Sequence, residues 1–345
     1  MKTFRVAMPP DIYDAEGNLK FKDMGLSVFD EYPLLESYVL TDTRAEIGSD
    51  QLREANGMVV FGGRVTPESV SNAENLLVFS RIGVGYDSVD VDACTDNDVV
   101  LLITSGAVDR SVAEAAIGWL LALTHNVVAK DRLVRTGNWN DRTLYHGIEL
   151  RDRTFGSIGL GGIARETIRL LRVFGMQRPL AFDPYVTSKA AAEIGVELVE
   201  LDELMRRADF VSVHCPLNEE TRDLVGQAEL GMMKVGSYII NTARGGIVNE
   251  EALYDVLVKR QIAGAAIDCF DGEPLVEPHR FGKLDNVLLA PHSIAWTEEL
   301  FRDIGAAAIR GVAELAMGRL PAGVVNLEVL ERPGYRDKWK RLQVG

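Results

Sequence analysis

Short apolar runs recur along this 345-residue chain, and segments with helical or turn-forming patterns separate them. The runs are FRVAM (4–8), MVVF (58–61), LLVFS (76–80) and VVLLI (99–103), and later FGSIGL, LAFD, FVSVHC, SYIIN, AGAAID and VLLAP. They are apolar throughout, which is the pattern of strands buried on both faces of a parallel sheet. Because helical segments alternate with these strands, we predict the α/β class with doubly wound parallel sheets.

The length of the chain favours two domains with separate cores, since domains commonly hold ~100 to 200 residues. Apolar residues at helical spacing from Ser111 to about Leu123 predict a long helix that leaves the first sheet. Thr297 is a suitable N-cap for a helix, running to about Met317, that returns the chain to the first domain. We therefore expect two Rossmann-like domains with a cleft between them, one made of residues 1–110 plus 298–345 and the other of residues 111–297.

The charge balance argues against nucleic acid and membranes as partners. The chain has 51 acidic residues against 37 Lys and Arg, a formal charge of -14, and no run of basic residues. The longest apolar stretch, from Val112 to Ala129, contains Glu114 and His125, so we interpret it as a buried helix and not as a membrane span.

Cysteine usage and the N-terminal residues indicate the cytoplasm. Cys94, Cys215 and Cys269 are far apart and show no CxxC spacing, which fits a reducing compartment. The first residues, MKTFRVAMPPD, contain one short apolar run cut by two prolines, and this is not a signal-peptide core. We expect a cytoplasmic protein.

A glycine-rich segment, Ser157–Ala164, follows one predicted strand and opens a helix, and Asp183 ends the next strand. This is the G-x-G-x-x-G/A pattern of a dinucleotide-binding turn in its required context. Gly159 permits the tight turn, and Gly161 lets the backbone approach a pyrophosphate at the helix N-terminus. Asp183 can accept hydrogen bonds from both hydroxyls of an adenosine ribose. A methyltransferase, with similar glycines and a similarly placed acid, is the competing interpretation.

Three more motifs follow later strands, at the carboxyl edge where an open α/β sheet has its chemistry. They begin at Asn241 (NTARGG), Asp268 (DCFDGEP) and Ala290 (APHS). An arginine, a glutamate and a histidine are thereby expected in one crevice. A guanidinium can bind a carboxylate, and a histidine beside a carboxylate can transfer a proton. A methyltransferase would leave this set unexplained.

With these motifs and the segments RIGVGYD (81–87) and VSVHCPLNEETR (211–222), the chain resembles the D-isomer-specific 2-hydroxyacid dehydrogenase family over nearly its whole length. The family includes glyoxylate/hydroxypyruvate reductases, glycerate dehydrogenase and D-3-phosphoglycerate dehydrogenase. The resemblance implies an NAD-dependent oxidoreductase that interconverts a small anionic 2-keto acid and its D-2-hydroxy acid. Formate dehydrogenase relatives have Gln at the place of Glu273, and phosphite dehydrogenase relatives have Lys near Val84, so both reactions are disfavoured.

The resemblance also assigns roles to single residues. Arg244 would bind the substrate carboxylate and polarise the keto oxygen, His292 would donate the proton, and Glu273 would stabilise the imidazolium. The amides of Val84 and Gly85 would hold the substrate carboxylate. The residues implied for the cofactor are Gly159, Gly161, Gly162 and Ile163 at the pyrophosphate, Asp183 at the ribose, Thr242 and Ala243 on the nicotinamide side, Asp268 at the carboxamide, and His214 lining the cofactor.

Several points stay open from the sequence alone. Arg81 would meet a distal anion of the substrate, with a structural salt bridge as an equal alternative. Corepressors that sense NAD(H) use the same fold and retain the Arg, Glu and His set, so a binding protein is the alternative function. We expect no metal cofactor, a preference for NADH because Asp183 repels a 2'-phosphate, and a homodimer that packs through the helices around residues 111–150.

Overall fold

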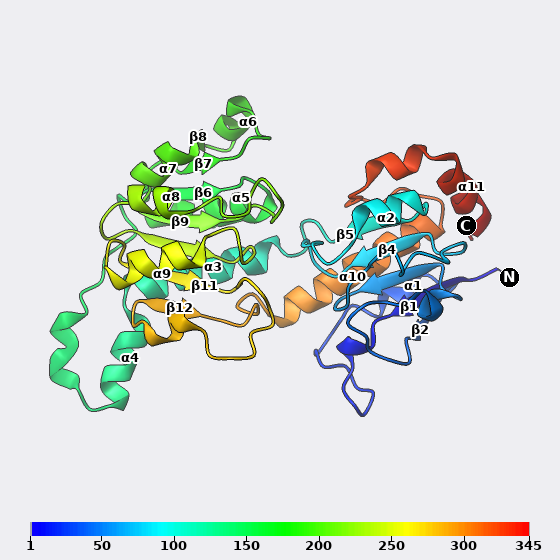
Figure 1. The fold of residues 1–345 in the computed structure, drawn as a ribbon, viewed down its shortest axis with the longest axis horizontal. Helices are drawn as coiled ribbons and strands as arrows, with labels where there is room; N and C mark the ends of the chain where they lie inside the picture. The colour runs from blue at the N-terminus through cyan, green and yellow to red at the C-terminus, as the bar shows by residue number, and fades with distance from the viewer. Residues whose placement is uncertain (1, 345) are drawn as a thin grey trace. The chain divides into compact units, whose positions relative to one another are not determined.

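The computed structural model describes residues 2–344, and these residues form two compact units (Figure 1). Unit 1 contains the residues up to Val108 together with those from Trp296 onward, and unit 2 runs from Asp109 to Ala295. Each unit is built on its own parallel sheet, so the predicted fold class of two α/β domains is confirmed.

The sheet of unit 1 has the order β2-β1-β3-β4-β5, and all of its strand pairs are parallel. Its strands are β1 (Phe4–Met8), β2 (Leu35–Val39), β3 (Gly57–Val60), β4 (Val78–Arg81) and β5 (Val100–Ile103). Helix α10 (Glu298–Ala316) packs on β3, β4 and β5, and α2 (Val91–Asp96) packs against β5. Short helices α1 (Val28–Glu31) and α11 (Pro333–Leu342) complete the unit. Thr297 caps α10 as its side chain predicts, because its Oγ1 accepts from the Leu300 amide at 3.0 Å.

Strand β2 is absent from the sequence prediction. It lies at the edge of the sheet, and only Leu35 of its residues is buried. An edge strand with polar side chains has no continuous apolar run, so the pattern used for the central strands could not find it.

The sheet of unit 2 has the order β12-β11-β10-β9-β6-β7-β8, again parallel throughout. Its strands are β6 (Phe155–Ile158), β7 (Leu180–Phe182), β8 (Glu197–Leu198), β9 (Phe210–Val213), β10 (Tyr238–Asn241), β11 (Gly264–Ile267) and β12 (Val287–Leu289). The chain starts in the middle at β6, moves to one edge, and then crosses to β9 and the other edge. This reversal beside β6 is the switch point at which open α/β sheets bind their ligands.

Helices cover both faces of this sheet (Figure 1). One face carries α7 (Leu201–Arg207), α8 (Gln227–Met232) and α9 (Glu250–Val258), which share a core with Val211, Ile239 and Ala265 of the sheet. The opposite face carries α3 (Asp109–Thr124), α5 (Gly162–Leu171) and α6 (Ser188–Glu193), with Ile240 and Ala266 in the second core. Strands covered on both sides explain why their sequences are apolar throughout.

Helix α3 is followed at once by α4 (Val127–Arg135), and the two axes differ in direction by 59°. Among residues 2–344, no single helix has the length and hydropathy of a membrane span; α3 and α4 reach them only when taken as one bent pair.

Candidate active site

The glycine-rich turn joins β6 to α5 at the switch point. Gly159 has φ +92°, and a Cβ atom there would lie 2.9 Å from the amide nitrogen of Cys215, so only glycine fits this turn. At Gly161, a Cβ atom would meet nothing within 4 Å, and α5 begins at the next residue, Gly162. The amides of Gly162 and Ile163 are at the helix N-terminus beside this open space. The turn therefore fits the pyrophosphate of a dinucleotide.

Asp183 follows β7 and lies beside the same turn. Its Oδ2 accepts a hydrogen bond from the Leu160 amide at 2.8 Å, and its Oδ1 accepts one from the Tyr185 amide at 2.9 Å. Two backbone donors thus fix the orientation of the carboxylate, and each oxygen keeps a second lone pair for a ribose hydroxyl.

One carboxylate near the turn escaped the sequence reasoning. A Cβ atom at Gly162 would lie 2.1 Å from Oδ2 of Asp109, the first residue of α3. Burial raises the pKa of Asp109, and the nearby Glu166 raises it further. The proximity comes from the packing of α3 on α5, which no local pattern in the sequence reveals.

The turn after β10 carries Arg244 and is shaped by the buried amide of Asn241. Nδ2 of Asn241 donates to the Arg244 carbonyl at 2.8 Å, and its Oδ1 accepts from the Ala243 amide at 3.0 Å. A Cβ atom at Gly245 would lie 1.9 Å from the carbonyl carbon of Phe270. Glycine is required here because the Arg244 turn lies directly on the loop after β11, which carries Glu273.

Thr242, in the same turn, has a side-chain oxygen that is buried and has no hydrogen-bond partner among the described residues. A buried hydroxyl without a partner is costly, so it indicates a group that this structure does not contain. The orphaned oxygen fits the expected contact of Thr242 with the nicotinamide side of a cofactor.

His292 and Glu273 form a direct pair. His292 Nδ1 lies 2.7 Å from Oε2 of Glu273, and Oε1 of Glu273 accepts from the Phe270 amide at 2.6 Å. Burial alone would raise the pKa of Glu273, but the His292 hydrogen bond, the Phe270 amide and the charge of Arg244 together lower it below its usual 4.5. Glu273 is therefore a carboxylate at neutral pH, and its hydrogen bond orients the imidazole.

A different acid, Asp268, holds the backbone of His292. His292 has φ +51°, and its amide donates to the Asp268 carbonyl at 2.8 Å. The Asp268 carboxylate accepts from the amides of Ser293 at 2.9 Å and Ile294 at 3.2 Å. Burial raises the pKa of Asp268, while these amides and the charge of His292 oppose the rise. Asp268 thus shapes the turn that carries His292, and its predicted contact with the nicotinamide carboxamide stays a prediction.

His214 lies at the carboxyl end of β9, next to the glycine-rich turn. Its amide donates to the Ile158 carbonyl at 2.8 Å, and its Nε2 lies 2.9 Å from the Ser212 hydroxyl oxygen. Burial lowers the pKa of His214 to about 4, so the ring is neutral at physiological pH.

The three predicted substrate residues outside unit 2 lie together in unit 1, at the carboxyl end of β4. Nη1 of Arg81 donates to the carbonyls of Ile82 at 2.5 Å and Val60 at 3.4 Å. Val84 and Gly85 follow in the turn after β4 and are partly buried.

An aromatic cluster and a half-buried acid, none of them predicted as site residues, also lie in unit 1. Trp296 packs on Phe21 and Phe301 with ring centroids 5.7 and 5.2 Å away, and Phe21 also contacts Phe61 just after β3. Oδ2 of Asp11 accepts from the Gly62 amide at 2.7 Å, and burial raises the pKa of Asp11 although Arg81 lowers it in part. Trp296 contacts two rings of this cluster while 53% of the residue stays exposed.

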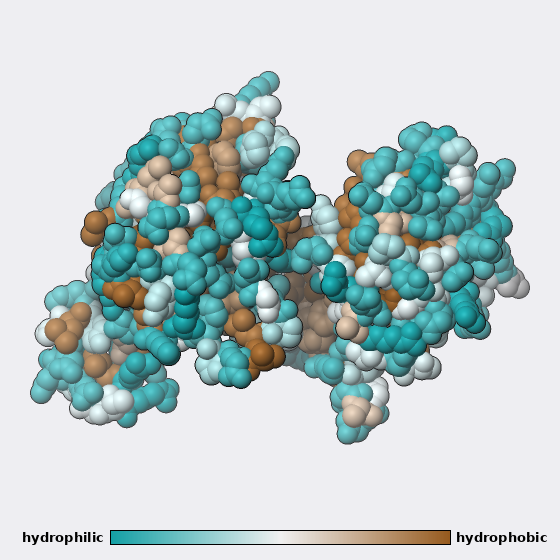
Figure 2. All heavy atoms as spheres, in the orientation of Figure 1, coloured by the Kyte–Doolittle hydropathy of each residue, from teal (hydrophilic) through white to brown (hydrophobic). Residues whose placement is uncertain are grey.

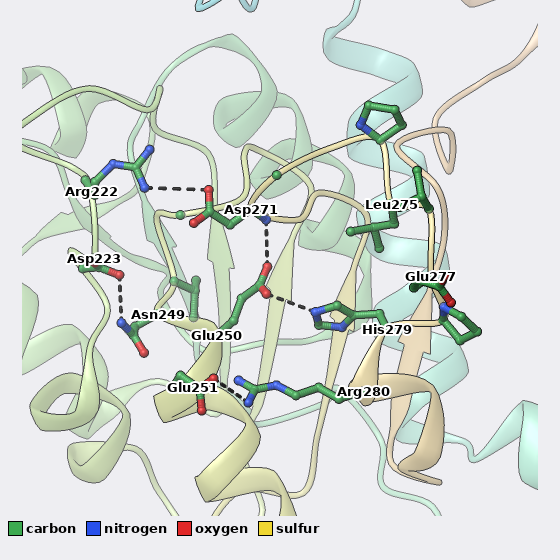
Figure 3. A pocket seen from close by; sticks show the side chains of 16 residues that line it. Arg222, Asp223, Asn249, Glu250, Glu251, Asp271, Leu275, Glu277, His279 and Arg280 are labelled. Atoms are coloured by element: carbon green, nitrogen blue, oxygen red, sulfur yellow. Dashed lines mark hydrogen bonds and ion pairs between the residues drawn. The ribbon is translucent and has the colours of Figure 1, made fainter.

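The loop that carries Glu273 also forms one wall of a pocket of about 650 Å³ in unit 2 (Figure 3). Glu250, the first residue of α9, reaches two points of this loop. Its Oε1 accepts from the Asp271 amide at 2.9 Å, and its Oε2 lies 3.1 Å from Nε2 of His279. Glu250 therefore ties both sides of the Glu273 loop to α9, and only the tertiary structure reveals this role.

Comparison with known proteins agrees with this geometry. The NAD-binding domain of D-isomer specific 2-hydroxyacid dehydrogenases matches residues 117–293. The glyoxylate reductase of Aeropyrum pernix is 32% identical over 346 aligned residues, which cover 97% of this chain and 100% of that protein. A solved glyoxylate reductase from Paecilomyes thermophila is 26% identical with a TM-score of 0.77, covering 95% of this chain and 100% of that one.

D-3-phosphoglycerate dehydrogenases are also similar. The protein of Methanocaldococcus jannaschii is 36% identical over 294 residues, which are 85% of this chain and 56% of that protein. The chain thus spans about half the length of the D-3-phosphoglycerate dehydrogenases that it matches. The family match confirms a nicotinamide dinucleotide as the cofactor predicted from the glycine-rich turn. The chain belongs to the family of NAD-dependent D-isomer-specific 2-hydroxyacid dehydrogenases.

Proposed function

We propose that this protein interconverts a small 2-keto acid and its D-2-hydroxy acid with NAD as cofactor. The observation that carries the proposal is the pair of His292 Nδ1 and Glu273 Oε2 at 2.7 Å. The pair lies at the carboxyl edge of the sheet that also carries the glycine-rich turn and Arg244. An acid–base pair, a guanidinium and a dinucleotide site are the parts that this reaction requires.

In the direction of reduction, a nicotinamide cofactor held at the glycine-rich turn and beside Thr242 would supply a hydride to the keto carbon. His292 supplies the proton: with Nδ1 turned to Glu273, its Nε2 is left to donate to the oxygen that becomes the hydroxyl. The carboxylate of Glu273 stabilises the protonated ring. Arg244 binds the substrate carboxylate and polarises the keto oxygen, and in the oxidising direction His292 takes the proton back.

The relatives named glyoxylate reductase and hydroxypyruvate reductase support a short substrate. We propose that Arg81 of unit 1, with Val84 and Gly85 in the following turn, contributes to substrate binding. A distal polar group on the substrate would then distinguish hydroxypyruvate from glyoxylate.

We further propose a cytoplasmic homodimer. The segment from α4 through residue 144 exposes several large apolar side chains, which support a contact with a second copy. These are Val127, Val128, Val134, Trp139 and Leu144, each at least half exposed. Figure 2 shows apolar spheres on this segment, at the place of α4 in Figure 1.

The test is oxidation of NADH with glyoxylate, hydroxypyruvate, pyruvate and 3-phosphohydroxypyruvate in turn. Arg244→Ala should lower kcat/KM about 10- to 150-fold, because a charged hydrogen bond to the substrate is worth ~1.5 to 3 kcal/mol. Arg206→Ala, at an exposed side chain of α7 that pairs with Asp202, is the matched control and should leave turnover unchanged. Tight NADH binding with negligible turnover of every keto acid would instead favour the NAD(H)-sensing binding protein.

A further inference from the structure

Cys269 lies beside the acid–base pair, and the mechanism above does not use it. Its Sγ, a carboxylate oxygen of Glu273 and a ring nitrogen of His292 all lie within 4.8 Å of one another. Within residues 2–344, no other group of three or more His, Cys, Asp and Glu side chains converges in this way. The Cys269 residue is 1% exposed, whereas the side chains of Glu273 and His292 are 30% and 45% exposed.

A thiolate, an imidazole and a carboxylate are the ligand types that Zn²⁺ binds in proteins. Tetrahedral bonds of ~2.0 to 2.3 Å to the ion place neighbouring ligand atoms about 3.3 to 3.6 Å apart. The His292 and Glu273 atoms, now at 2.7 Å, would separate by a few tenths of an ångström. Sγ, which lies within 4.8 Å of both atoms, would approach them by at most about 1.5 Å. Sγ donates to the Ala243 carbonyl at 3.4 Å, and because a thiol is a weak donor this hydrogen bond is given up at little cost.

We propose that Cys269, Glu273 and His292 form a binding site for a thiophilic divalent cation such as Zn²⁺, and that binding reversibly inhibits the enzyme. The thiol releases its proton to solvent, and the proton between His292 Nδ1 and Glu273 moves to Nε2 of the ring or to solvent. Sγ, Nδ1 and the Glu273 oxygen then bond to the ion, and no atom changes oxidation state. Water fills the fourth position. The inhibitory consequence rests on the proposed function, because the imidazole and carboxylate that hold the ion cannot also form the proton-transfer pair.

Cys269 is the residue that separates this site from an ordinary acid–base pair. Without the thiol, the ion would have only an imidazole and a carboxylate that are both partly exposed. Loss of even an indirect partner of a metal site costs ~10- to 100-fold in affinity, so loss of a direct ligand should cost at least as much. Cys269→Val keeps a buried side chain of similar volume, and Cys269→Ser keeps the size with a poorer ligand. Cys215→Val is the matched control in the same unit.

The experiment uses the full chain after treatment with a chelator. ZnCl₂ is titrated while NADH oxidation is measured with the best keto acid, and Zn²⁺ affinity is measured separately by calorimetry. Co²⁺ in place of Zn²⁺ should give a thiolate-to-cobalt charge-transfer band, which reports Cys269 ligation without any turnover. We expect inhibition that a chelator reverses, a band in the Cys215→Val control, and at least a tenfold loss of Zn²⁺ sensitivity with no band in both Cys269 variants.

Several results would overturn the site. A Co²⁺ complex without the charge-transfer band, or unchanged Zn²⁺ sensitivity in both Cys269 variants, would remove Cys269 as a ligand. Activity that falls on chelation would show that the ion serves catalysis, against an inhibitory role. If no keto acid is turned over, the proposed function fails, but calorimetry and the Co²⁺ spectrum still decide whether the site exists.

Discussion

At His292, the backbone and the side chain are held by different acids. Asp268 fixes the amides from His292 to Ile294, and Glu273 bonds to Nδ1 of the ring. The left-handed backbone of His292, with φ +51°, is uncommon for a residue with a side chain. Because the two roles are separate, a change at Glu273 should alter the ionisation of the pair without moving the turn.

The first prediction concerns Glu273→Gln. The pKa of Glu273 is lowered, so the wild-type side chain carries its negative charge through the neutral range and stabilises protonated His292. Reduction needs the protonated ring, so its rate falls as the pH rises. Removing the charge should move this fall to lower pH, whereas His292→Ala should lose ~10²-fold or more at every pH. The measurement is kcat/KM for keto-acid reduction against pH. An unchanged profile in Glu273→Gln would show that Glu273 does not stabilise the protonated ring.

The second prediction concerns cofactor choice at Asp183. The carboxylate opposes a 2'-phosphate, so NADH should give a higher kcat/KM than NADPH. Asp183→Asn keeps an oxygen for one of the two amide donors, from Leu160 or Tyr185, but removes the charge. The preference for NADH should then fall about tenfold, as expected for loss of one repulsion between close, partly screened charges. Equal kcat/KM for both cofactors in the wild type would show that Asp183 does not face the ribose.

At the scale of the elements, Glu250 connects α9 to the loop that carries Glu273. Both of its oxygens are used, one by the Asp271 amide and one by His279. In Figure 3 the Glu250 side chain lies between these two partners. Since Glu250 itself does not contact the acid–base pair, it is a positioning residue.

The third prediction is that Glu250→Gln lowers kcat by about 3- to 30-fold with little change in the KM for NADH, because a loosened loop holds Glu273 less well. The neighbouring Glu251→Gln is the control, because the Glu251 side chain is 82% exposed and pairs with Arg280 at 2.6 Å. Equal effects of the two substitutions would place Glu250 in the general scaffold. A pH profile that broadens only in Glu250→Gln would support the positioning role.

Features encoded by neighbouring residues could be predicted from the sequence. The central strands, the turn at Gly159 and the cap at Thr297 depend on local patterns, and the structure contains them all. Edge strands β2 and β8 were missed because they have little continuous apolar sequence. The contacts of Asp109 with Gly162 and of Glu250 with the Glu273 loop depend on helix packing, so no spacing rule could find them.

At the scale of the whole molecule, the exposed apolar segment from α4 through residue 144 is the surface that we propose contacts a second copy. The fourth prediction is that Trp139→Asp combined with Leu144→Asp shifts a dimer toward monomer. The two residues are 61% and 75% exposed in the single chain. A carboxylate placed there would be buried in the dimer interface, and the cost of burying that charge opposes association. Sedimentation velocity measures the change. Val235→Asp, at a residue that is 89% exposed elsewhere in unit 2, should leave the assembly state unchanged. Identical sedimentation of all three proteins would exclude this segment as the interface.

The fifth prediction concerns the pH dependence of stability. Burial lowers the pKa of His214 to about 4, against 6.5 when the ring is free. The unfolded chain therefore binds the proton more readily than the folded chain between these two values. The stabilisation is complete above pH 6.5 and is lost as the pH falls from 6.5 toward 4.

Between pH 7 and pH 5, this linkage should lower the free energy of unfolding of the wild type by about 1 to 2 kcal/mol. His214→Gln has no such proton to bind, so its urea midpoint should change less over the same interval. His146→Gln removes an exposed histidine from a loop and should behave like the wild type. The carboxylates whose pKa values are lowered, Glu273 among them, lose their contribution to folding stability only below about pH 4.5. They therefore do not contribute to the change in stability between pH 7 and pH 5. If the midpoints of wild type and His214→Gln fell in parallel from pH 7 to pH 5, the interpretation that His214 is neutral in the folded protein would have to be abandoned.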